Sequence, residues 1–134
     1  MAKIKLLIDT DIIIDLLKGV KTAKELFRSN RFDLYCSIQS KKELISKVGL
    51  RDSERKKIIA ILSTIKVLKV DNDISNKFSI LIEKYGDNPE SIADYIIAAT
   101  AWAKKLSILT RNRKHFERIK EVFLCPGYAY KDTE

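Results

Sequence analysis

Apolar and polar residues alternate along the chain in short blocks that predict strands and helices in turn. The run from Leu6 to Ile8 is wholly apolar and stops at Asp9, which fits a strand covered on both faces in a parallel sheet. The pattern predicts strands at 3–8, 33–37, 66–70, 107–110 and 122–124. It predicts helices at about 11–18, 22–29, 40–48, 53–64, 74–85 and 90–105, with a short one at 114–119. The alternation indicates an α/β fold with helices on the faces of a parallel sheet.

The length of 134 residues and the hydrophobic content of 46% suit one globular core. We therefore expect a single domain over residues 1–134, with 126–134 as a loosely held tail. No apolar run approaches the about 18 to 20 residues that a membrane helix needs, and the first residues lead into a strand without a signal-peptide pattern. The expected location is the cytoplasm, with no membrane partner.

The formal net charge of +8 suggests a polyanionic partner, although solvated lysine-rich helix faces would give the same composition. Basic residues gather between positions 104 and 120, where Glu117 is the one acid. Composition alone leaves the two interpretations open.

Polar side chains follow the predicted strands at positions that topology can bring together. Asp9 ends the first strand, Glu43 lies in the first turn of the helix after the second strand, and Asn112 lies just beyond the fourth strand. Asp94 is in the first turn of the helix before that fourth strand. Strand ends and the starts of the following helices share one edge of a parallel sheet, so we expect these side chains to be neighbours there. Asp94, whose helix precedes its strand, must reach that edge by way of the long connection through residues 85–89.

Helix capping is the structural alternative for several of these acids. Ser40 with Glu43, and Ser91 with Asp94, match the spacing of a capping box, while Asp11 could cap the first helix and Asp15 lie on its exposed face. Capping does not account for Asp9, an acid that ends a buried strand. Carboxylates gathered at one place repel each other unless a cation neutralises them, and Mg²⁺ or Mn²⁺ prefers such oxygen ligands. An acidic metal site in a basic protein indicates a nuclease.

Four sequence motifs resemble those of PIN-domain endoribonucleases of the VapC toxin family. They are Asp9-Thr10-Asp11 after an apolar strand, Glu43, the run 91–101 that begins Ser-Ile-Ala-Asp, and the run 108–119 that contains Leu-Thr-Arg-Asn and His-Phe. The resemblance covers nearly the whole chain in the right order. It implies a three-layer α/β/α domain whose parallel sheet has four to five strands in the order 3-2-1-4-5.

The resemblance also implies a function. By it, the chain is a Mg²⁺- or Mn²⁺-dependent ribonuclease and the toxin of a toxin–antitoxin pair. It hydrolyses RNA phosphodiesters with metal-activated water and leaves a 5′-phosphate and a 3′-hydroxyl. The implied partners are the RNA substrate, a cognate VapB-type antitoxin and a second copy of the chain in a homodimer.

Carried over by position, Asp9, Glu43 and Asp94 are the metal ligands, with Thr110 and Asn112 supporting the catalytic site. Many relatives have an acid where this chain has Asn112 and another where it has His115, so a second tightly bound metal is in doubt. Asp11 stands where the family often has Asn and is interpreted as a secondary contact or a cap.

Several other residues carry expectations. Arg111, Arg113 and Lys114 follow the fourth strand and are our candidates for phosphate contacts, with simple solvation as the alternative. His115, beside Phe116, is expected to be a packed structural residue, and Trp102 to belong to the core or the dimer interface. Cys36 and Cys125 are expected to be free, buried thiols, since three strand spacings of about 4.8 Å would separate their strands.

Three other functions share part of this pattern. A haloacid-dehalogenase-like phosphatase would use Asp9 as its nucleophile, but it needs a Lys and an acidic pair after the strand that ends at Thr110. A receiver-type binding module could use Asp71, but it needs a Lys that the segment 124–126 does not supply. The third is a non-catalytic PIN-like module that binds RNA or an antitoxin, which the presence of all three acids disfavours.

Overall fold

Four parallel strands form the central sheet of the protein, in a computed structural model that describes residues 2–86, 88 and 91–128. The order is β3-β2-β1-β4, as expected for the first four strands. The strands are β1 (Ile4–Ile8), β2 (Phe32–Ser37), β3 (Lys66–Leu68) and β4 (Ser107–Leu109). The predicted fifth strand is reduced to one parallel bridge between Ile108 and Leu124, on the expected outer side of β4.

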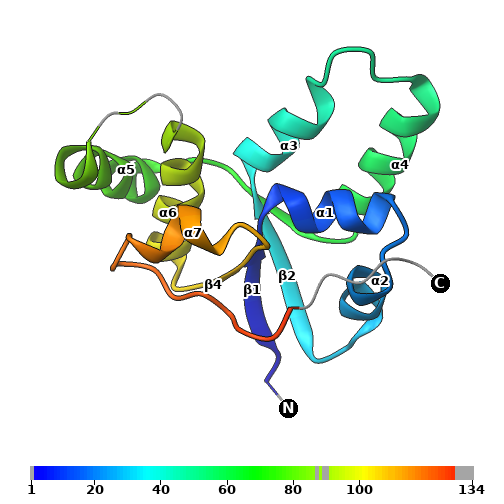
Figure 1. Ribbon diagram of the computed structural model, residues 1–134, viewed down its shortest axis with the longest axis horizontal. Coiled ribbons are helices and arrows are strands. Elements are labelled where there is room, and N and C mark those ends of the chain that lie inside the picture. The colour runs from blue at the N-terminus through cyan, green and yellow to red at the C-terminus, as the bar shows by residue number, and fades with distance from the viewer. Residues whose placement is uncertain (1, 87, 89–90, 129–134) are drawn as a thin grey trace.

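Seven helices of the described residues cover the sheet. They are α1 (Thr10–Leu17), α2 (Lys21–Arg28), α3 (Ile38–Ile45), α4 (Asp52–Leu62), α5 (Asn72–Tyr85), α6 (Ile92–Lys104) and α7 (Arg113–Glu117). Helices α5, α6 and α7 lie on one side of the sheet, and α1 to α4 on the other (Figure 1). The three-layer α/β/α fold predicted from the sequence is thus confirmed.

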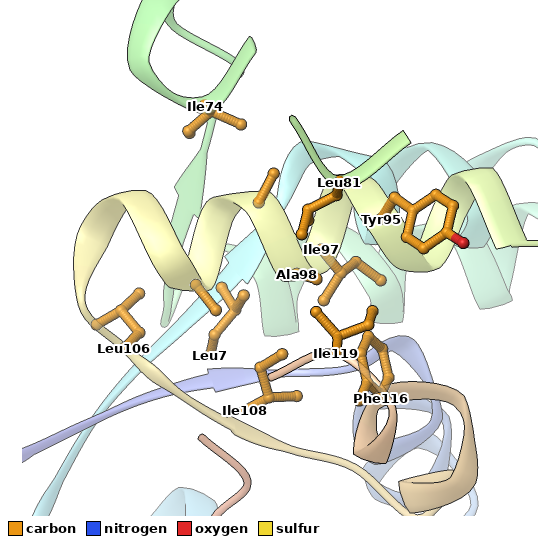
Figure 2. Packing of buried hydrophobic residues seen from close by; sticks show 12 residues of the cluster. Leu7, Ile74, Leu81, Tyr95, Ile97, Ala98, Leu106, Ile108, Phe116 and Ile119 are labelled. Carbon is orange, nitrogen blue, oxygen red and sulfur yellow. The ribbon is translucent and has the colours of Figure 1, made fainter. Parts of the chain in front are cut away.

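The two faces of β1 pack into two different cores. Leu7 joins Ile108 of β4 beneath α6, where both point toward Ile97 and Ala98 (Figure 2). On the opposite face, Leu6 and Ile8 pack with residues of α1, α3 and α4. Because both faces are buried, β1 is apolar at consecutive positions.

One expectation about the core needs correction. Cys36 is buried and free as expected, but Cys125, also free, is only partly buried. Burial raises the pKa of the Cys36 thiol to about 12. Trp102 packs against the core, in line with expectation, although it is only partly buried, and Lys77 Nζ lies 5.1 Å from its ring centroid.

No helix among the described residues is long and apolar enough to cross a membrane. Of the expected loose tail, residues 126–128 are described, whereas 129–134 lie outside the described residues.

Candidate active site

Asp9 lies directly after β1, where the chain turns into α1, and its side chain is buried (7% exposed). Its Oδ1 accepts a hydrogen bond from the backbone N–H of Thr10 at 2.7 Å, which makes Asp9 the N-cap of α1. We expected that helix capping would not account for Asp9. That expectation was wrong for its Oδ1, which caps α1. The other oxygen, Oδ2, accepts a hydrogen bond from the Thr110 hydroxyl at 2.8 Å.

Thr110 reaches Asp9 because β1 and β4 are adjacent and in register, with Ile8 opposite Leu109. The Thr110 hydroxyl donates to Asp9 and accepts from the backbone N–H of Asn112 at 3.0 Å. Asn112 is exposed and precedes α7. Its contact with the site is through this backbone group.

Asp11 lies in the first turn of α1, close to Asp9. Its Oδ2 accepts a hydrogen bond from the backbone N–H of Arg111 at 3.0 Å. Its Oδ1 is buried and has no hydrogen-bond partner among the described residues. Burial, and after it the charge of Asp9, raise the pKa of Asp11 to about 6. Asp11 therefore does not cap the helix, but belongs to the acidic cluster.

Asp94 enters the cluster from the first turn of α6 and is partly buried. Its Oδ2 lies 3.2 Å from His115 Nδ1. Burial raises the pKa of Asp94, His115 opposes this rise, and the charge of Glu43 adds to it. The Ser91 side chain makes no cap hydrogen bond, so the capping-box alternative for Asp94 was wrong.

Glu43 projects from α3, and its Oε1 accepts a hydrogen bond from Gln39 Nε2 at 3.4 Å. The helix begins at Ile38, two residues earlier than predicted, because Ser37 caps it through the backbone N–H of Gln39. Ser40 is thus inside the helix, and a capping box between Ser40 and Glu43 is excluded.

Electrostatic coupling links Asp9, Asp94 and Glu43. Burial raises the pKa of Asp9 most, and the charges of Asp94 and Glu43 raise it further. No three His, Cys, Asp or Glu side chains among the described residues lie close enough together to hold an ion by themselves. The acids therefore influence one another electrostatically without closing into a tight metal cage.

The donor set fits a hard cation that keeps part of its water shell. The four acids offer carboxylate oxygens, and Mg²⁺ in proteins commonly binds one or two carboxylates and several waters. The buried, unpartnered Oδ1 of Asp11 is a polar atom that a cation or one of its waters would satisfy.

Comparison with known proteins identifies the family. The PIN domain family matches residues 6–122. The chain belongs to the PIN domain family. It is 33% identical over 130 residues to Ribonuclease VapC10 of Mycobacterium tuberculosis, with 92% of this chain and 96% of the relative covered. It is also 33% identical over 127 residues to Ribonuclease VapC19 of the same organism, covering 91% and 98%.

Solved structures agree with this assignment. A toxin–antitoxin complex from Klebsiella pneumoniae is 30% identical, with a TM-score of 0.71 and coverage of 87% of this chain and 94% of that one. The VapBC2 structure from Rickettsia felis shares the fold, with a TM-score of 0.75, 21% identity and coverage of 91% and 98%. This PIN domain is therefore a member of the VapC group and an enzyme of the nuclease class.

The phosphatase and receiver alternatives are thereby excluded. Asp71, which a receiver-type module would need at a strand end, caps α5 through the backbone N–H of Ile74. Asp9 directly follows β1, near the start of the region that matches the family.

Sequence reasoning missed two contacts of this PIN domain. The Thr10 hydroxyl donates to the buried Ser40 hydroxyl at 2.9 Å and so joins α1 to α3 behind Asp9. In the sequence, the position of Ser40 one helical turn before Glu43 was the signal that could have indicated this contact. His115 is exposed and contacts Asp94, whereas its neighbour Phe116 is the packed residue. The expectation that His115 is packed was wrong.

The three basic residues after β4 that were expected to contact phosphate differ in their contacts. Arg111 Nε forms a 3.0 Å ion pair with Asp15, which is fully buried rather than on the exposed face of α1. Arg113 donates to the carbonyl of Cys125 at 3.2 Å. Lys114 is exposed.

Proposed function

We propose that the protein is a divalent-metal-dependent endoribonuclease, the toxin of a toxin–antitoxin pair. The observation that carries the proposal is the buried Asp9, which is bound to Thr110 and electrostatically coupled to Asp94 and Glu43. Such coupling of acids in a basic protein of this family suits a metal-assisted attack on a polyanion. The names of the relatives, Ribonuclease VapC10 and VapC19, support RNA as the substrate.

Asp9, Asp94 and Glu43 are the proposed metal ligands, and Mg²⁺ or Mn²⁺ the proposed ions. When bound, the ion neutralises the acids, lowers the pKa of a bound water and stabilises charge on the leaving oxygen. Thr110 fixes Asp9 by donating to its Oδ2, and the buried pair of Thr10 with Ser40 holds α1 against α3. These residues set the orientation of the acids before RNA arrives.

The proposed reaction is hydrolysis of one phosphodiester. The oxygen of a water forms a new bond to phosphorus while the bond from phosphorus to the 3′ oxygen breaks. The water loses one proton, and the leaving 3′ oxygen takes up one proton. The products are a 5′-phosphate and a 3′-hydroxyl, and Arg113 and Lys114 contact flanking phosphates. Arg111 also contacts phosphate, but its ion pair with Asp15 limits how far its guanidinium can reach.

The proposed antitoxin partner docks in a groove of about 630 Å³ between α1, α3 and α4. Its walls are largely apolar, and its rim is mainly basic, although Glu54, paired with Arg51, also lines it. The walls include Ile14, Leu17, Leu44, Leu50 and Ile58, and the rim Lys18, Lys47, Arg51 and Lys57. This chemistry suits a tail that is both apolar and acidic, and the groove reaches Thr10 and Glu43, so its occupant would restrict access to the acids. A homodimer is also proposed, to be tested by light scattering.

The test is cleavage of labelled RNA by the purified chain with Mg²⁺, with Mn²⁺ and with a chelator. We expect cutting only with metal, with 5′-phosphate ends, and no cutting by Asp94→Asn. Asp33→Asn, at a partly exposed carboxylate paired with Lys3, is the matched control and should cut normally. Binding of RNA without any metal-dependent cutting would favour the non-catalytic module instead.

A further inference from the structure

Arg118, which directly follows α7, is held against the first turn of α6. Its Nη2 donates to Ser91 Oγ at 3.2 Å and to the Tyr95 hydroxyl at 3.0 Å. Its guanidinium carbon lies 5.3 Å from the centroid of the Tyr95 ring and 5.9 Å from that of Tyr85. Two hydrogen bonds and two aromatic faces therefore fix one end of an otherwise exposed side chain.

This position places a positive charge next to Asp94. Ser91 and Tyr95, the two hydrogen-bond partners of Arg118, lie on either side of Asp94 in the same helical turn. Burial raises the pKa of Asp94, and the charge of Arg118 opposes this rise, although less than His115 does. Within the part of the chain that the structure describes, however, Arg118 forms no ion pair with a carboxylate, unlike Arg111 with Asp15. Its charge is held in place without being neutralised there.

A purely structural role for Arg118 would be to attach α7 to α5 and α6. Other contacts already attach this part of the chain to both helices, and one of them is that of His115 with Asp94 of α6. Glu121 accepts hydrogen bonds from Lys84 Nζ and from the Tyr85 hydroxyl, both at 2.7 Å, and the backbone N–H of Lys120 donates to the Tyr85 hydroxyl at 3.1 Å. The segment after α7 is therefore attached to α5 without the guanidinium.

We propose that Arg118 is a catalytic residue whose guanidinium donates hydrogen bonds to a non-bridging oxygen of the phosphate that is cleaved beside Asp94. The inference rests on the ribonuclease function proposed above. As water adds to phosphorus and the 3′ oxygen leaves, charge builds up on the phosphate oxygens. Arg suits this role because its donors form a rigid, planar fork that remains charged. The two tyrosines fix the guanidinium in advance, so little reorganisation is needed during the reaction.

The test compares Arg118→Ala and Arg118→Lys with the wild-type chain in single-turnover and steady-state cleavage. We expect Arg118→Ala to lower kcat by about 100-fold with a much smaller change in KM. Added guanidinium should restore part of the lost rate, and Arg118→Lys should fall between the two. Arg55→Ala, which removes the same charge from an exposed position on α4, is the control and should keep the wild-type kcat.

Three results would overturn the inference. One is a wild-type kcat in Arg118→Ala; another is a loss confined to KM, which would assign Arg118 to general attraction of RNA. The third is a loss in both variants that follows a drop in thermal stability and is not rescued by guanidinium, which would make Arg118 structural. A wild-type chain that cuts no RNA would instead refute the proposed function itself, so the two failures are distinguishable.

Discussion

Asp9 combines two roles that the sequence presents as alternatives. One carboxylate oxygen caps α1, and the other is held by Thr110 toward the acidic cluster. Burial and the neighbouring charges of Asp94 and Glu43 all disfavour its ionised form. The residue is therefore electrostatically unfavourable in the absence of a cation, which is typical of groups retained for function.

Replacing Asp9 separates these roles. Asn caps helices about as well as Asp, so Asp9→Asn should keep the fold and unfold at the same or a higher temperature without metal. Its RNA cleavage should fall by at least about 10²-fold, the scale of losing one electrostatic contribution at an active site. Asp9→Ala should lose the cap as well, at a cost of about 1 kcal/mol. Thermal unfolding and cleavage rates measure both; an Asp9→Asn chain that is much less stable would indicate that capping dominates.

The titration of Asp11 predicts how stability depends on pH. Its pKa of about 6 in the folded chain lies above the ordinary value of 3.8, so the folded state binds the proton more tightly than the unfolded state. Stability of the metal-free chain should therefore fall as pH rises from about 4 to 6, by on the order of 1 kcal/mol. Urea unfolding across this range measures it. Asp11→Asn should flatten the dependence, and an unchanged slope in that variant would contradict the assignment.

At the scale of elements, most of the fold was predictable because strands and helices alternate with different periodicities. Gly19 and Gly86, which lie at the ends of α1 and α5, have φ values of 78° and 95°, a region that glycine adopts readily. The start of α3 was misplaced because Ser37 and Ser40 offer equally plausible caps in the sequence. The predicted fifth strand was too long, because a short apolar run does not reveal that only Leu124 pairs with β4.

The site was predictable in its acids but not in its supporting contacts. Asp9, Asp94 and Glu43 carry recognisable motifs. The bond from Thr110 to Asp9 joins residues far apart in the chain, and it depends on the register of β1 with β4. Asp15 looked exposed because its helical face is polar in sequence; it is buried because Arg111 and Tyr128 cover it. Such pairings follow from tertiary structure and not from local pattern.

The contacts of Asp15 join three segments of the chain. Its Oδ2 accepts a hydrogen bond from the Tyr128 hydroxyl at 2.8 Å and pairs with Arg111 at 3.0 Å, so α1, the loop after β4 and the segment after Leu124 meet there. Tyr128→Phe removes one hydroxyl and should destabilise the chain by about 1 to 3 kcal/mol. Arg111→Ala, which leaves a buried charge unpaired, should cost more. Chemical denaturation measures both, and a Tyr128→Phe chain as stable as wild type would show that this contact contributes nothing.

At the scale of the whole molecule, an acidic site lies within a protein of net charge +8. The basic residues attract the backbone of a nucleic acid over a long range, while the acids act only where the metal neutralises them. Attraction and cleavage therefore depend on different residues. They should respond differently to salt and to metal.

Salt titration of RNA binding tests this separation. The affinity of the Asp94→Asn chain for RNA should fall linearly with salt on a double-logarithmic plot, because phosphate contacts release counterions. Removing both proposed contacts, with Arg113→Gln and Lys114→Gln, should reduce the slope by about 2, or about 1 for each phosphate contact. The control is Lys21→Gln with Lys24→Gln, which changes the net charge equally at exposed positions on α2. An equal reduction in both double variants would mean that net charge alone governs binding, and that the loop after β4 does not contact the RNA.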